Sequence, residues 1–128
     1  MRTVAVVGLS ADPSRTSHRI AAYLQGAGIR VVPVTPRHDE VLGETAYPSL
    51  LAIPEDVEVD VVCVFRQPAF TAAVVEDAAD RRERTEQNPV VWTQLGVSSA
   101  EAERIAAFER IPYVADRCLM VDHAALAQ

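Results

Sequence analysis

Short runs rich in valine alternate along this chain with segments of helical periodicity, and this alternation constrains the fold more than any other feature. The runs cover residues 3–7, 30–34, 59–65 and 90–93, with a shorter one at 112–115. The run at 59–65 (VDVVCVF) is almost continuously apolar, which is typical of a parallel strand covered on both faces. The pattern therefore predicts an α/β fold with parallel strands and right-handed crossovers.

Four helices are expected between and after these strands. The first covers 17–27, with Ser17 as its N-cap and Gly28 closing its C-terminus. The others cover 68–79, a segment capped by Ser98 or Ser99 and ending at 109, and 119–126. The charge-dense stretch 80–87 either extends its helix or loops out, and we expect it to be solvated. The fold class is then a Rossmann-like three-layer sandwich with a five-stranded, mainly parallel sheet.

Length and composition limit the number of domains and the classes of function that are possible for this protein. The 128 residues suit one domain, residues 1–128, and the net charge of -6 argues against binding nucleic acid, which rewards a surplus of Lys and Arg. The opening MRTVAVVGLS reads as strand and turn, not as a secretory signal, and no apolar run is long enough to span a membrane. We therefore expect a cytoplasmic protein with Cys63 and Cys118 reduced.

Ligands of such sheets bind beyond the carboxyl ends of the strands, where the strand order reverses. Four segments should converge there: 8–10, 35–37, 65–68 and 94–96. They bring Arg37 and Arg66, and Arg15 lies in the first loop. Gly8 permits a tight turn, and the amides near Ser17 can meet phosphate oxygens, so phosphate binding is chemically reasonable.

The known nucleotide motifs narrow the choice of ligand. Residues 8–17 contain neither GxGxxG nor a P-loop ending in GK[ST], so this loop alone also fits a structural turn. After the second strand an NAD site needs an acidic residue, but this chain has Thr35, Pro36 and Arg37. Arg37 suits a phosphorylated ribose, as in coenzyme A or NADP, although an exposed loop arginine is the competing interpretation.

The segments VAVVGLSADPSRTSHRIAAYL, VVPVTPR, LGETAYPSLLAIP, DVVCVFRQP, VVWTQLGV and DRCLMVDHAAL closely resemble the stand-alone CoA-binding domain proteins, over nearly the whole chain. They are also similar to the CoA-binding domain of the succinyl-CoA ligase alpha subunit. The resemblance implies a coenzyme A cofactor with the pyrophosphate beside Gly8 and Ser10, the ribose phosphate at Arg37, and the adenine or pantetheine near Phe65. The implied cofactor-binding residues are Gly8, Ser10, Arg15, Ser17, Pro36, Arg37, Val64, Phe65, Arg66 and Gln94.

No catalytic residue or metal site is predicted. The three histidines are scattered, and the chain has no lysine for Schiff-base chemistry. Cys63 is interpreted as a core residue. Cys118 follows Arg117 near a helix start, a setting that can make a thiol reactive, but a structural role is the favoured interpretation. We therefore expect a non-catalytic carrier, sensor or regulatory module for coenzyme A or an acyl-CoA, with an NADP-binding oxidoreductase-type domain as the alternative. A protein partner or a homodimer is left open.

Overall fold

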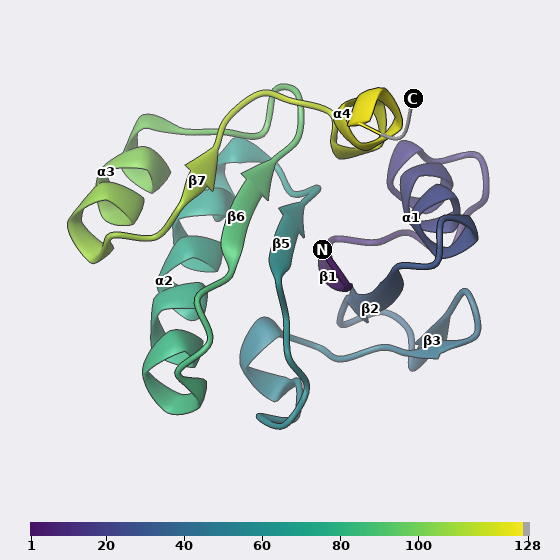
Figure 1. The fold of residues 1–128 in the computed structure, drawn as a ribbon, viewed down its shortest axis with the longest axis horizontal. Coiled ribbons are helices and arrows are strands. Elements are labelled where there is room, and N and C mark those ends of the chain that lie inside the picture. The colour runs from purple at the N-terminus through teal and green to yellow at the C-terminus, as the bar shows by residue number, and fades with distance from the viewer. Residues whose placement is uncertain (127–128) are drawn as a thin grey trace.

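A five-stranded parallel sheet forms the centre of the computed structural model, which describes residues 1–126 (Figure 1). Its strands stand in the order β2-β1-β5-β6-β7, and every pair of neighbours is parallel. The strands are β1 (Thr3–Val7), β2 (Arg30–Val34), β5 (Val61–Val64), β6 (Val90–Thr93) and β7 (Tyr113–Val114). The predicted fold class is confirmed, and the run at 59–65 supplies the central strand.

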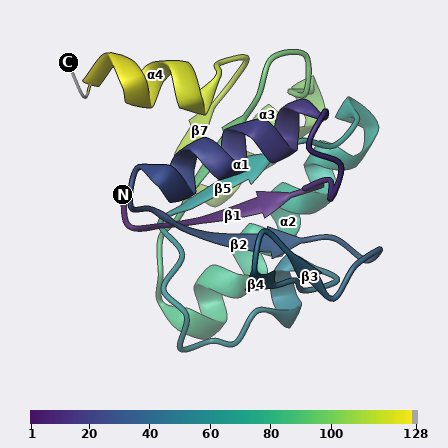
Figure 2. The same ribbon diagram turned by 90° about the vertical axis from the view of Figure 1, so that its right-hand side faces the viewer.

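Helices cover both faces of the sheet, so alternate residues of each strand enter different cores. On β1, Val4 and Val6 pack in the cluster that contains α1 (Thr16–Gly26) and α4 (Leu119–Leu126). Ala5 and Val7 pack in the other cluster, with α2 (Pro68–Thr85), α3 (Ala100–Glu109) and the 3-10 turn η1 (Leu50–Ala52). Figure 2 shows α1 and α4 on one side of the strands.

The second helix is longer than the 68–79 core of the prediction, because the charged stretch continues it to Thr85. The expectation that this stretch is solvated is wrong at Arg81, whose side chain is buried. Its guanidinium donates to the carbonyl oxygens of Ile53, Pro54 and Val57 at 2.8, 3.0 and 2.7 Å. These three acceptors come from the loop after η1, so Arg81 ties that loop to α2 and offsets its own loss of hydration.

A small antiparallel hairpin is formed by β3 (Glu40–Val41) and β4 (Glu44–Thr45), between β2 and η1. Leu42 and Gly43 both have positive φ, 55° and 75°, as the central residues of a two-residue hairpin turn require. The strands are only two residues long and the turn lacks an Asn-Gly pair, so the sequence pattern does not predict this hairpin.

The last two helices follow the prediction. Ser99 caps α3 by accepting a hydrogen bond from the Ala102 amide at 3.1 Å, and α4 covers the expected residues. Within residues 1–126, no helix has both the length and the apolar character needed to cross a membrane.

Candidate functional site

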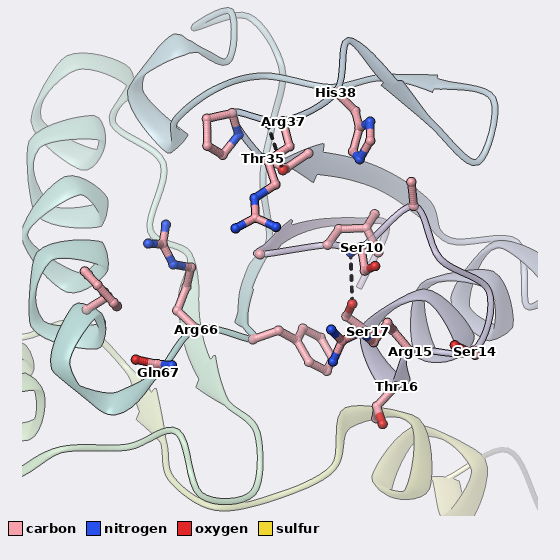
Figure 3. A pocket seen from close by; sticks show the side chains of 16 residues that line it. Ser10, Ser14, Arg15, Thr16, Ser17, Thr35, Arg37, His38, Arg66 and Gln67 are labelled. Atoms are coloured by element: carbon pink, nitrogen blue, oxygen red, sulfur yellow. Dashed lines mark hydrogen bonds between the residues drawn. The ribbon is translucent and has the colours of Figure 1, made fainter.

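A cavity of about 930 Å³ opens at the carboxyl ends of β1, β2 and β5 (Figure 3). The strand order reverses between β1 and β5, so the cavity lies at the topological switch point where ligands of such sheets bind. Its lining comes from the loops after the three strands and from the first turns of α1 and α2. The lining residues are Gly8, Leu9, Ser10, Ala11, Ser14, Arg15, Thr16, Ser17, Thr35, Pro36, Arg37, His38, Phe65, Arg66, Gln67 and Phe70.

Gly8 lets the loops after β1 and β5 approach each other closely. Its φ is +86°, and a Cβ atom at this position would lie 2.8 Å from the carbonyl oxygen of Phe65. The Gly8 amide donates to Val34 at 2.9 Å, and the Phe65 amide donates to Val7 at 2.8 Å. The backbone at the switch point is therefore fixed from both sides, and only glycine fits there.

The loop after β1 is folded back on the start of α1. The amide of Ser10 donates to the Oγ of Ser17 at 3.0 Å, and Ser17 is buried. The prediction of Ser17 as N-cap is wrong, because the helix begins at Thr16 and Arg15 holds the cap position without a side-chain cap bond. The first amides of α1 thus face the cavity without a side-chain acceptor, an arrangement that favours an anion.

Asp12 holds the tip of the same loop. Its carboxylate accepts the amide and the hydroxyl of Ser14 at 2.9 and 2.8 Å, and the Asp12 amide donates to the hydroxyl of Ser10 at 3.1 Å. The bond from the Ser14 amide holds the pKa of the Asp12 carboxyl below its usual range. The carboxylate is used within the loop and does not line the cavity.

The cavity is cationic although the protein is acidic. Arg15, Arg37 and Arg66 reach it from three different segments, and none of the described lining residues is Asp or Glu. Within residues 1–126, no hydrogen bond or ion pair occupies these three guanidinium groups, so their donors are available to a ligand. Figure 3 shows Arg15 beside Ser17 at the start of α1, with Arg37 and Arg66 on the opposite wall. Such a surface attracts a ligand with several negative charges.

Eight of the ten residues predicted to hold the cofactor line this cavity: Gly8, Ser10, Arg15, Ser17, Pro36, Arg37, Phe65 and Arg66. Val64 is fully buried within β5 and does not line it. Gln94 does not line it either. The Oε1 of Gln94 accepts the amide of Leu119 at 2.9 Å and the thiol of Cys63 at 3.5 Å, so this side chain supports α4.

Leu9, Thr35 and Gln67 also line the cavity and lie in segments that were expected to converge here. The remaining lining residues were not singled out from the sequence: Ala11, Ser14, Thr16, His38 and Phe70. Most lie in the same loops as the predicted ones, so loop membership was the available signal. Phe70 is different, because it lies in the first turn of α2, outside these loops.

The two cysteines differ in their surroundings. Cys63 is fully buried, as predicted for a core residue, and burial raises the pKa of its thiol far above the usual range. Cys118 is half-buried just before α4, and the guanidinium of Arg117 is engaged by both carboxylate oxygens of Asp122. The basic neighbour that made Cys118 a candidate is thus paired elsewhere.

A parallel sheet with a cationic cavity at its switch point defines a Rossmann-like α/β protein. The chain belongs to the CoA binding domain family, which it matches over residues 2–124. It is 37% identical to the uncharacterized protein YneT of Bacillus subtilis, over 96% of this chain and 86% of that protein.

Other relatives place the same domain in two settings. A hypothetical protein from Pyrococcus horikoshii is similar in structure, with a TM-score of 0.88 and 36% identity over 98% of this chain and 83% of that one. An ADP-forming acetate–CoA ligase of Archaeoglobus fulgidus is 28% identical over 91% of this chain, but this chain spans only 16% of the ligase. The domain thus occurs both in small proteins and as a part of large ones.

Proposed function

We propose that this protein binds coenzyme A or an acyl-CoA in the cavity at the switch point, as a non-catalytic carrier, sensor or regulatory module. The observation that carries the proposal is the set of three unengaged arginines around a lining without carboxylates. Coenzyme A matches it because the molecule has a ribose 3'-phosphate and a pyrophosphate, separated by the ribose. Membership of the CoA binding domain family supports the same ligand.

Each part of the ligand has a counterpart in the lining. The pyrophosphate would lie at the start of α1, where Arg15 and the amides near Ser17 supply donors. The 3'-phosphate would lie at Arg37, after β2. Phe65 and Arg66 would flank the adenine or the pantetheine. Gln94 has no part in this arrangement, because its carbonyl oxygen is already used by α4.

The non-catalytic part of the proposal rests on what the lining supplies. Its ionisable side chains are three arginines and His38, which suit the binding of phosphate groups. Neither cysteine is among the residues that line the cavity. In the ligase relative, most of the protein lies outside the part that this chain matches. Two free thiols also fit a reducing compartment, so we assign the protein to the cytoplasm.

Calorimetric titration with coenzyme A, dephospho-coenzyme A, NADP and NAD at one salt concentration tests this proposal. We expect coenzyme A to bind more tightly than its dephospho form, because only the former offers a 3'-phosphate to Arg37. If NADP bound best, the oxidoreductase-type alternative would replace the proposal. No binding of any of the four would contradict both.

A further inference from the structure

One aromatic ring in the cavity wall is not explained by packing. Phe70, in the first turn of α2, is 47% exposed and belongs to neither hydrophobic cluster among the described residues. A large apolar side chain loses free energy by remaining in water, and this one lines a cavity whose other walls are mostly polar. Its ring is therefore available for contact with a ligand.

The guanidinium of Arg66 lies over this ring, with its central carbon 4.6 Å from the ring centroid. The stem of Arg66 passes close to the switch point, since its Cδ would be 3.3 Å from a Cβ placed on Gly8. Within residues 1–126, no carboxylate or carbonyl oxygen accepts a hydrogen bond from this guanidinium. The stem and the aromatic ring thus hold a planar cation at the edge of the cavity.

The local backbone fixes this pair. Gln67 is the N-cap of α2 and Pro68 occupies its first turn, so the chain enters the helix with a restricted φ. The Phe70 amide donates to the Gln67 carbonyl at 2.9 Å, which closes the turn that carries the ring. Arg66 and Phe70 therefore face each other across one tight turn, and little ordering entropy remains to be lost on binding.

A planar cation lying over an aromatic ring is suited to a flat heterocycle more than to a phosphate. Guanidinium planes and aromatic faces both stack on nucleobases. Figure 3 shows Arg37 and Arg66 directed into the same part of the cavity. A base attached to a ribose whose phosphate lies at Arg37 would thus come near the Arg66 side.

We propose that Arg66 and Phe70 form a stacking platform for the adenine base, with Phe70 as the positioning residue that holds the guanidinium flat. This inference rests on the proposed function and specifies it, because it divides the arginines by task. Arg15 and Arg37 recognise phosphates, and Arg66 recognises the base.

The test compares two ligands that differ only in the base: adenosine 3',5'-bisphosphate and uridine 3',5'-bisphosphate. The wild type should prefer the adenosine compound, because a purine stacks over more area. Phe70→Leu, which keeps an apolar side chain without a ring, should reduce affinity for the adenosine compound about fivefold and change the uridine compound less. Arg66→Lys, which keeps the charge without the plane, should do the same. Phe108→Leu is the matched control, because Phe108 is 85% exposed on α3, outside the cavity.

Two results would overturn the platform. One is unchanged binding of the adenosine compound by both Phe70→Leu and Arg66→Lys. The other is an equal loss for both ligands in Arg66→Ala with no effect of Phe70→Leu, which would make Arg66 a phosphate ligand. Failure of the proposed function looks different, because then the wild type itself would bind neither bisphosphate nor coenzyme A.

Discussion

The carboxyl edge of the sheet has two halves that use their polar groups differently. At the ends of β2, β1 and β5, no hydrogen bond or ion pair within residues 1–126 occupies the guanidinium groups around the cavity. At the ends of β6 and β7, polar groups bond to one another. The amide of Gly96 donates to Asp116 at 3.0 Å, the indole of Trp92 to the Arg117 carbonyl at 2.7 Å, and the amide of Leu119 to Gln94 at 2.9 Å.

This contrast teaches that a place at the end of a parallel strand does not make a residue a ligand contact. Gln94 and Arg66 both follow buried strands, but the side chain of Gln94 is buried against α4 while Arg66 faces the cavity. What separates the two halves is whether the protein already supplies partners for the polar groups. A site for a charged ligand needs donors that the fold leaves unsatisfied.

Replacing the glycine of each half by alanine should show the largest difference. Gly8→Ala puts a Cβ against the Phe65 carbonyl and strains a positive φ, so we expect a loss of about 3 kcal/mol in the free energy of unfolding. Gly96 has a φ of +75° with nothing within 4 Å of an added Cβ, so Gly96→Ala should cost about 1 kcal/mol. Urea unfolding of both variants measures this, and equal losses would mean that the switch point is not tightly packed.

Gln94→Ala tests whether the second half is structural. The substitution leaves the buried Leu119 amide without its acceptor and opens a cavity, so unfolding should become easier by about 2.5 kcal/mol. Coenzyme A affinity, measured by calorimetry, should not change. Gln67→Ala is the matched control, because this exposed glutamine lies in the first half and should leave stability unaltered. A large loss of affinity in Gln94→Ala with normal stability would return Gln94 to the ligand site.

Arg37→Ala should have the opposite profile. We expect about a tenfold weaker affinity for coenzyme A, or about 1.4 kcal/mol, with no change in thermal unfolding. Affinity for dephospho-coenzyme A should stay the same, because that ligand lacks the phosphate assigned to Arg37. Arg104→Ala, at an exposed position on α3, controls for the loss of a positive charge. An equal loss of affinity for both ligands would move the 3'-phosphate away from Arg37.

The smallest effect concerns the pH dependence of the loop after β1. The pKa of Asp12 lies below its ordinary value of 3.8 because Ser14 donates to the carboxylate. The unfolded chain therefore binds this proton more readily, so the stabilisation is complete above about pH 4 and is lost as the pH falls through the lower folded value. Asp12→Asn should be slightly less stable than wild type at neutral pH, and urea titrations should show the gap narrowing as the pH falls below the ordinary value. A gap that stays constant would contradict this role of the carboxylate.

The fold could be predicted closely because its elements depend on local patterns. Valine-rich runs, helix caps and turn residues are visible in the chain, and the central strand and α4 lie where these patterns put them. The differences arise where a long-range contact or an unusual backbone conformation decides the local structure. Three backbone carbonyls bury Arg81 in a stretch that looks solvated, and two positive φ values create the hairpin at Leu42 and Gly43.

The candidate site could be predicted in part for the same reason. The place of the three arginines at the site could be predicted from their positions after parallel strands. The sequence does not reveal which other polar side chains are hydrogen-bonded within the protein itself. Ser17 was expected to cap its own helix, and it accepts from Ser10 instead. Phe70 could not be singled out, since its exposure depends on where α2 lies relative to the cavity.

The most direct test of the account is an amide chemical-shift titration of the isotope-labelled protein with coenzyme A. We predict that the largest shifts occur at residues 8–17, 35–38 and 65–70, whereas Gly96, Asp116 and Leu119 change little. The largest shifts in the second group would contradict the claim that the half of the sheet edge with unsatisfied donors is the ligand site.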